Sequence, residues 1–178
     1  MGGPTDADLV RAARAGSDAA FGRLVERHQS VVRGFLRRTL GVSWAEADDV
    51  AQETFLAAWQ SLRALKDPAG VRSWLLGIAW RRAQDRLRSA RRAAERDRSW
   101  LEAIVLPEGV SHDDRLALAS ALGALPPDQR ACVALCLAEG LSHVEAAEAL
   151  DMPLGTVKSH VLRGRTRLLS ALGGSGDA

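Results

Sequence analysis

Residues 142–172 read SHVEAAEALDMPLGTVKSHVLRGRTRLLSAL, and this stretch decides the fold of the carboxyl-terminal part of the chain. Ser142 and Glu145 have the spacing of a capping box, which predicts the start of a short helix. Asp-Met-Pro at 151–153 then turns the chain. A second helix is expected from Leu154 onward. Its buried face is expected to hold Val157, Val161, Gly164 and Leu168. The stretch therefore predicts a helix-turn-helix.

The exposed face of the second helix is basic, because residues 154–172 hold four Lys or Arg and no acid. This face carries the candidate DNA contacts Lys158, Ser159, Leu162 and Arg163. Arg165 and Arg167 lie at its flanks. A short helix, a tight turn and a basic helix fit insertion into the major groove of DNA. The alternative is a solvated cationic helix in an ordinary bundle, since similar patterns occur in proteins that never touch DNA.

The rest of the chain is also helical in pattern, and no segment has the alternation that a strand needs. Helices are expected near 45–62, 71–98, 113–122 and 127–139, after two earlier helices begun by Thr5 with Asp8 and by Ser17. The prediction is an all-α fold of two small helical domains. They span 1–98 and 113–172, with a flexible linker at 99–112 and a disordered tail at 173–178.

Composition limits the class of protein. The chain has 178 residues, 47% of them apolar, a net charge of +2 and a pI near 8.9. The amino terminus lacks a signal-peptide pattern, and no apolar run approaches the ~20 residues of a membrane helix. We therefore expect a cytoplasmic protein with no membrane insertion. No carboxylate pair, Ser/His/Asp set or phosphate loop occurs at workable spacing, so we expect no enzyme, no small-molecule substrate and no cofactor.

The two cysteines, Cys132 and Cys136, lie four residues apart in a helical pattern. Their Cβ atoms would be roughly 5–6 Å apart, too far for a disulfide. They could supply half of a metal site, but no histidine follows at zinc-finger spacing and His143 is the nearest. We favour buried core cysteines and no metal.

The expected helix at 45–62 has an acidic face, and residues 39–62 contain no Lys or Arg. Its apolar side is Ala47, Val50, Ala51, Thr54, Phe55, Ala58 and Leu62. The opposite side shows Glu46, Asp49, Gln52, Glu53, Leu56 and Gln60. Such a stripe suits the docking of a basic helical partner, although an acidic helix face can also be merely solvated.

The expected helix at 71–98 is the opposite, with nine arginines against three acids. One face carries Trp74, Arg81, Gln84 and Arg88, and the other carries Leu75, Leu76, Ala79, Trp80, Ala83 and Leu87. Arginine and aromatic side chains together can hold phosphates and stack on unpaired bases. Trp74 has two interpretations, as a base contact or as an anchor in the core.

Three segments, in this order, resemble the extracytoplasmic-function sigma factors of the sigma-70 superfamily, which are bacterial transcription initiation factors. DDVAQETFL at 48–56, followed by Trp59, resembles their polymerase-binding segment. SWLLGIA at 73–79 resembles the start of their promoter-melting helix. EGLS at 139–142, EAA at 145–147 and GTVKS at 155–159, with Arg163, resemble their helix-turn-helix. The likeness covers nearly everything from about residue 6 to residue 172.

The resemblance implies roles for particular residues. The polymerase-binding segment, which contacts the clamp helices of the largest polymerase subunit, would include Asp48, Asp49, Gln52, Glu53 and Leu56. The helix-turn-helix would read promoter DNA at the −35 element. The loop and helix that bind the −10 element would include Lys66, Asp67, Trp74, Arg81, Gln84 and Arg88. An anti-sigma factor is the expected regulatory partner, and the apolar residues of the linker suggest that it docks on something.

The chain departs from the family pattern at Gly77 and at Trp80-Arg81, where relatives often have Arg and then Arg-Asn. These departures affect the details of −10 recognition. Two other functions remain open: a sigma-like decoy that binds an anti-sigma factor without reading DNA, and a helix-turn-helix repressor or activator. A decoy should have lost the charge of its DNA faces, which are intact here. For a repressor or activator, the acidic stripe and the Arg-Trp helix have no evident use.

Overall fold

The computed structural model describes residues 3–94 and 112–173, with side chains over 3–90 and 117–171. Within these ranges every regular element is helical, which confirms the all-α prediction. The amino-terminal elements are α1 (Asp6–Arg14), α2 (Asp18–Leu40), α3 (Trp44–Ser61), the short turns η1 (Leu62–Ala64) and η2 (Pro68–Gly70), and α4 (Val71–Ala94). The carboxyl-terminal elements are α5 (His112–Gly123), α6 (Pro127–Val133), η3 (Ala134–Ala138), α7 (His143–Leu150) and α8 (Leu154–Gly173).

Local capping explains where the first helices begin and end. Thr5 and Asp8 form a reciprocal capping box at α1, and the hydrogen bonds from Thr5 lower the pKa of Asp8. The Ser17 hydroxyl accepts from the backbone N–H of Ala20 at the start of α2. Gly41 ends α2 in the left-handed conformation, with φ of 68°. A second box, Ser43 with Glu46, begins α3 and was not predicted.

One expected helix differs from the prediction. The pattern predicted a continuous helix over 127–139, whereas α6 gives way after Val133 to the π-helical turn η3. The backbone N–H of Glu139 bonds to the carbonyl of Ala134, five residues earlier, at 3.0 Å. Gly140 follows with φ of 69°. The chain therefore leaves this helix through a widened turn that ends at Glu139.

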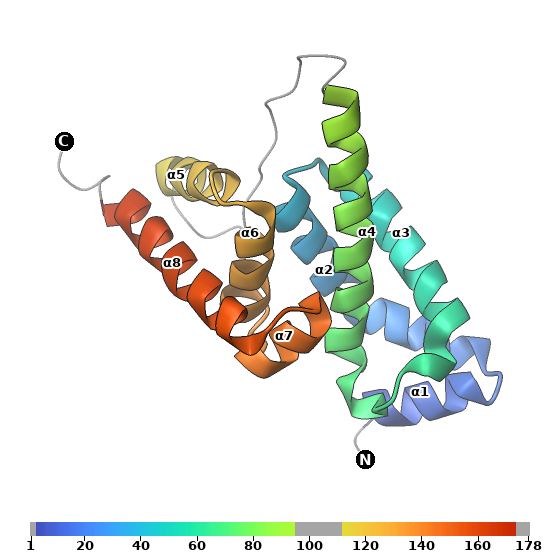
Figure 1. Ribbon diagram of the computed structural model, residues 1–178. Coiled ribbons are helices and arrows are strands. Elements are labelled where there is room, and N and C mark those ends of the chain that lie inside the picture. Colours follow the sequence, from blue (N-terminus) through green and yellow to red (C-terminus); the bar gives the residue numbers. More distant parts are fainter. Residues whose placement is uncertain (1–2, 95–111, 174–178) are drawn as a thin grey trace.

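The helices form two bundles, α1–α4 and α5–α8, which pack against each other (Figure 1). Within the described residues, one apolar core runs from Val10 and Phe35 through Leu76 and Trp80 to Leu135 and Leu150. A smaller cluster joins α5, α6 and α8 around Leu122, Leu125 and Val133. The expected linker at 99–112 lies almost wholly outside the described residues, as do its apolar side chains.

Ion pairs, a hydrogen bond and helix packing join the two bundles within the described residues. Glu139 pairs with Arg38 of α2 and with Arg72 of α4. Arg130 of α6 donates to the carbonyl oxygen of Thr39 at 3.2 Å. In Figure 1, α7 lies against the amino-terminal half of α4. The two bundles, expected to be joined by a flexible linker, therefore also share a direct interface.

Candidate polymerase-binding and DNA-binding surfaces

The turn between α7 and α8 has the geometry of the predicted helix-turn-helix. The Ser142 backbone N–H donates to Glu145 at 2.8 Å, and the Glu145 N–H donates to the Ser142 hydroxyl at 3.2 Å. These hydrogen bonds lower the pKa of Glu145. Asp151 ends α7 with φ of 52°, a left-handed conformation that Asp tolerates better than most residues. The Pro153 carbonyl then accepts the first backbone hydrogen bonds of α8.

Helix α8 buries the stripe that its periodicity predicted. Val157 and Val161 are buried, Gly164 is buried and Leu168 is half-buried. A Cβ atom at Gly164 would lie 2.3 Å from Cγ2 of Val133, so glycine is what allows α8 to approach α6 this closely. On α7, by contrast, Val144 does not share the burial of Ala147 and Leu150 and is 54% exposed.

The residues expected to contact the −35 element all lie on the exposed side of α8. They are Lys158, Ser159, Leu162, Arg163, Arg165 and Arg167. Arg163 lies 3.4 Å from the His160 ring, on the same helix. Arg167 donates to the Gln129 side chain of α6 at 3.3 Å. Arg167 therefore helps to hold α8 on α6 as well as facing solvent.

Helix α3 exposes the acidic stripe that the sequence predicted. Asp49, Gln52 and Glu53 are exposed, and Leu56 is 59% exposed. Two carboxylates of this segment have partners within the α1–α4 bundle. Asp48 lies 2.7 Å from Arg33 of α2, and Glu53 lies 2.6 Å from Arg86 of α4. Asp49 and Gln52 are thus the members of the stripe best placed to meet another protein.

A largely apolar depression lies beside the acidic stripe, at the amino-terminal end of α2. Of the residues that line it, only Leu56 was among the predicted polymerase-binding residues. Phe21 and Trp59 pack with ring centroids 4.8 Å apart. With Leu56, Phe55 and Asp18 they line a shallow depression. Trp59 follows Leu56 by three residues, a spacing that places both on one helix face. That spacing was the signal that could have added Trp59 to the predicted surface.

Hydrogen bonds within the loop before α4, and from α1 to the residues that precede it, fix the conformation of this segment. The Asp67 side chain accepts from the Ala69 N–H at 3.0 Å, and the Ser73 hydroxyl donates to the Gly70 carbonyl at 3.0 Å. Arg14 of α1 donates to the carbonyl oxygens of Leu62 and Leu65, just before the loop. Lys66 and Asp67 remain exposed. Arg14 was absent from the predicted site because nothing in the local sequence links it to residues about fifty positions later.

On α4 the predicted faces are present, with differences in detail. Arg81 and Arg88 are exposed, Gln84 is half-buried, and Trp74 is half-buried and packs on the core. Arg88 pairs with Asp85 one turn earlier. Trp80, one of the departures from the family pattern, is fully buried, so that departure changes the core rather than the exposed face.

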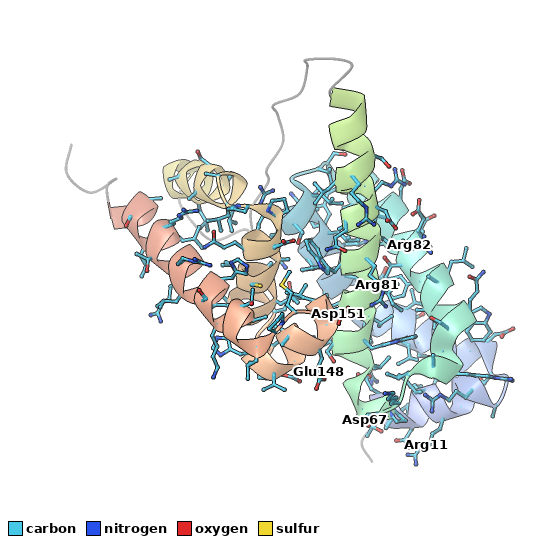
Figure 2. The ribbon with its side chains drawn as sticks, viewed as in Figure 1. Arg11, Asp67, Arg81, Arg82, Glu148 and Asp151 are labelled. Atoms are coloured by element: carbon cyan, nitrogen blue, oxygen red, sulfur yellow. The ribbon has the colours of Figure 1, made fainter. Side chains whose placement is uncertain are left out.

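Figure 2 shows how these elements lie. Arg81 and Arg82 project from α4 above the point where α7 approaches it. Glu148 and Asp151 mark α7, and Asp67 lies just before the amino-terminal end of α4, near Arg11 of α1. Arg81 and Arg82 thus lie beside the contact between the two bundles.

The two cysteines lie away from these surfaces, in the described part of the α5–α8 bundle. Burial raises the pKa of the Cys132 thiol to about 12 and also raises the pKa of Cys136. Cys132 is fully buried beside the Met152 sulfur, at 3.9 Å. Among the described residues, no group of three His, Cys, Asp or Glu side chains could hold a metal ion. No helix in the same part of the chain is long and apolar enough to cross a membrane.

Comparison with known proteins agrees with this layout. The model of sigma-70 region 2 matches residues 24–93, and that of sigma-70 region 4 matches residues 115–168. The RNA polymerase sigma factor CnrH of Cupriavidus metallidurans is 34% identical over 188 residues, covering 95% of this chain and 96% of its own length. The ECF RNA polymerase sigma factor SigM of Mycobacterium tuberculosis is also 34% identical, over 95% of this chain and 85% of its own length.

A solved structure of CnrH in complex with the cytosolic domain of CnrY shares the fold. It has a TM-score of 0.70 and 30% identity, and the match covers 97% of this chain and 99% of that one. The likeness thus extends across both bundles. With the helix-turn-helix, the acidic stripe and two relatives matched over nearly their whole lengths, the chain belongs to the extracytoplasmic-function sigma factors of RNA polymerase.

Proposed function

We propose that this sigma factor binds core RNA polymerase through the exposed stripe of α3 and reads promoter DNA through α8 and α4. The observation that carries the proposal is the separation of charge on the surface. Asp49 and Gln52 face solvent on an acidic helix, whereas Lys158 and Arg163 face solvent on a basic one. Acidic side chains suit a basic protein partner, and basic side chains suit phosphate and guanine.

The −35 element would be read by α8. Lys158, Ser159 and Arg163 lie opposite the buried stripe, so they would enter the major groove. Leu162 is 68% exposed on the same face, where it would contact the methyl group of a thymine. Arg165 and Arg167 flank the face and would contact the phosphate backbone.

The −10 element would be bound by the loop before α4 and by α4 itself. Lys66 and Asp67 are exposed at the loop, and Arg81 is exposed on the helix. Gln84 and Arg88 extend the same face. The half-buried Trp74 would present only one edge to an unpaired base. The chemistry needed is binding and strand separation, so we assign the chain no enzymatic step.

An anti-sigma factor is the proposed regulator. The related CnrH forms a complex with the cytosolic domain of CnrY, and its fold matches both bundles of this chain. Because its proposed partners are polymerase and the chromosome, we place this chain in the cytoplasm. Pull-down from uninduced cells should recover a small protein in addition to polymerase. Recovery of polymerase alone would contradict this part of the proposal.

In-vitro transcription tests the central claim. Purified chain, core polymerase and genomic fragments should give transcripts whose start sites share motifs near −35 and −10, and core polymerase alone should not. A chain that binds an anti-sigma factor but yields no transcript would be a decoy. A chain that binds duplex DNA but never co-elutes with polymerase would be a helix-turn-helix regulator.

A further inference from the structure

We propose that Arg14 of α1 is a positioning residue for the −10 element, because it fixes the loop before α4, residues 66–70, in the conformation that receives an unpaired base. The consequence for DNA rests on the proposed function of that loop, whereas the contacts that fix the loop are present in the free chain. The residues proposed to touch polymerase or DNA all lie outside α1.

Arg14 joins two parts of the α1–α4 bundle that are far apart in the sequence. Its Nε atom donates to the Leu62 carbonyl at 3.2 Å, and its Nη2 atom donates to the Leu65 carbonyl. Leu62 ends α3 and Leu65 directly follows η1, so both carbonyls belong to the chain that leaves α3. Carbonyls at the end of a helix lack partners within it, and a guanidinium offers several donors in one plane. Arg14 thus fixes the direction in which the chain enters the loop.

The guanidinium of Arg14 is committed to these backbone groups. It is half-buried, and among the described residues it forms no ion pair with a carboxylate. Arg11, one turn earlier on the same helix, instead pairs with Asp8 and is 68% exposed. Hydrogen bonds from a charged donor are stronger than those from a neutral one. Of the two arginines, Arg14 is therefore the one whose loss should release the loop.

Helix α1 is a firm base for this contact. Its inward side chains, Leu9, Val10 and Ala13, are buried. At its first turn, Asp6 pairs with Arg27 and lies 2.9 Å from His28, both on α2. The helix packs against η1 and η2 as well as α2, and in Figure 1 it lies beneath the end of α4 where the loop is. A side chain on α1 can therefore hold the loop against the body of the bundle.

The other end of the loop is fixed from α4. The Ser73 hydroxyl donates to the Gly70 carbonyl at 3.0 Å. Between the two fixed ends, Lys66, Asp67 and Ala69 are exposed. A loop that already has its bound conformation loses less conformational entropy when it captures a base. Removing the contact from α1 should therefore weaken base capture without removing any group that touches the base.

Three variants separate this role from others. Arg14→Met removes the donors but keeps a long side chain. Arg11→Met is the matched control, because it makes the same change at a residue whose contacts stay within α1. Arg14→Lys is a milder second variant, since it keeps the charge but a single ammonium lacks the planar fork that holds two carbonyls. Its effects should be intermediate between those of wild type and Arg14→Met.

Hydrogen–deuterium exchange of the free full-length chain measures the loop directly. The Ala69 and Gly70 amides donate to the side chain and the backbone carbonyl of Asp67 at 3.0 and 3.1 Å. In Arg14→Met they should exchange about ten times faster, the factor that corresponds to freeing roughly one backbone residue. Arg11→Met should leave them unchanged. Exchange in α2 should be equal in all forms, and if it is faster in Arg14→Met, the comparison rests on Arg14→Lys.

The holoenzyme measures the consequence for DNA, on a promoter fragment recovered by in-vitro transcription and made with an unpaired −10 region. Arg14→Met should weaken binding about tenfold and relax discrimination at one position of the −10 element, because a loosened loop selects its base less strictly. The slope of log affinity against log salt should stay as in the wild type, since no phosphate contact is lost. A duplex with only the −35 element should bind all forms equally.

Three results would overturn the inference: unchanged exchange at Ala69 and Gly70, faster exchange with unchanged binding of the unpaired −10 region, or a loss that is equal for every −10 base and lowers the salt slope. The last would mean that Arg14 holds a phosphate. Failure of the proposed function looks different. In that case no form of the chain supports transcription with core polymerase, while the exchange still reports whether Arg14 fixes the loop.

Discussion

Arg33 of α2 lies 2.7 Å from the carboxylate of Asp48, whereas Asp49, the next residue of α3, is exposed. Two adjacent acids of the polymerase-binding segment therefore differ in surroundings. Asp48 joins α3 to α2 through a half-exposed ion pair, a contact worth at most about 1 kcal/mol. Asp49 remains available to another protein. Within the polymerase-binding segment, Asp48 therefore stabilises the packing of α3 on α2, whereas Asp49 faces solvent.

We expect Asp49→Arg combined with Glu53→Gln to abolish co-elution with core polymerase. Reversal at Asp49 places a positive charge against a basic partner surface, which costs on the order of several kcal/mol at a docked interface. Glu53→Gln removes the second acid without creating strong repulsion toward Arg86. Size-exclusion chromatography with core polymerase measures the loss. Glu26→Arg, on an exposed part of α2, should co-elute as the wild type does, and normal co-elution of the double variant would remove this interface.

The stability of the fold should fall in mild acid because of His28. This residue is 5% exposed, and burial lowers its pKa from the usual 6.5 despite the Asp6 carboxylate 2.9 Å away. Arg27 and Arg72 also face it and oppose protonation. The folded state therefore binds fewer protons than the unfolded state around this pH. The resulting stability is present above pH 6.5 and is lost as the pH falls toward the lowered pKa.

Urea unfolding at pH 7.5 and pH 5.5 tests the assignment. The wild type should have the lower midpoint at pH 5.5. His28→Gln should reduce the difference between the two midpoints, because its side chain does not titrate. His143→Gln, at an exposed histidine, serves as the control and should keep the wild-type difference. An equal difference in wild type and His28→Gln would show that another group is responsible.

Gly164→Ala should destabilise the α5–α8 bundle by about 1–3 kcal/mol, the usual cost of overpacking a close contact. The new Cβ atom would lie 2.3 Å from the Val133 side chain, which is stiff because it is branched at Cβ. Gly155→Ala is the matched control on the same helix, since nothing lies within 4 Å of its Cβ position. Thermal unfolding followed by circular dichroism compares them. Equal stability in the two variants would mean that α8 can shift away from α6 at little cost.

Most features that depend on neighbours in the sequence were predictable, although the capping box of Ser43 with Glu46 was missed. The capping boxes at Thr5 and Ser142 join residues three positions apart, so their spacing alone indicates where helices begin. The buried stripes of α3 and α8 follow from helical periodicity, which also gave the exposed faces on which the site residues lie. What periodicity provides is the direction of a side chain relative to its own helix.

Features that depend on distant parts of the chain were not predictable. Glu139 meets Arg38 about one hundred residues away, and Arg14 meets carbonyl groups about fifty residues away. Gly77 looked like a departure in a DNA-binding helix, yet its role in the structure is to admit Ala149. Single-sequence patterns hold no information on which helices meet, so the interface between the bundles appears only in three dimensions.

The arginines of α8 should divide into those that read bases and those that hold the backbone. Arg163 lies opposite the buried stripe, whereas Arg165 and Arg167 lie at its flanks. Arg167 also donates to Gln129, so its replacement would weaken the packing of α8 on α6 together with any DNA contact. Arg165 has no such hydrogen bond among those found in the described residues and is the cleaner probe of backbone binding.

Arg163→Ala should therefore cost about 1–3 kcal/mol on the cognate promoter and relax discrimination at one or two positions of the −35 element, as expected for a bidentate contact to guanine. Arg165→Ala should weaken promoter and scrambled duplexes alike and reduce the slope of log affinity against log salt by about one, because one phosphate contact is lost. Fluorescence anisotropy with both duplexes across a salt series separates the two effects. If both variants lose affinity equally on both duplexes, Arg163 holds phosphate rather than a base, and the face that α8 turns to the groove is rotated toward Arg165.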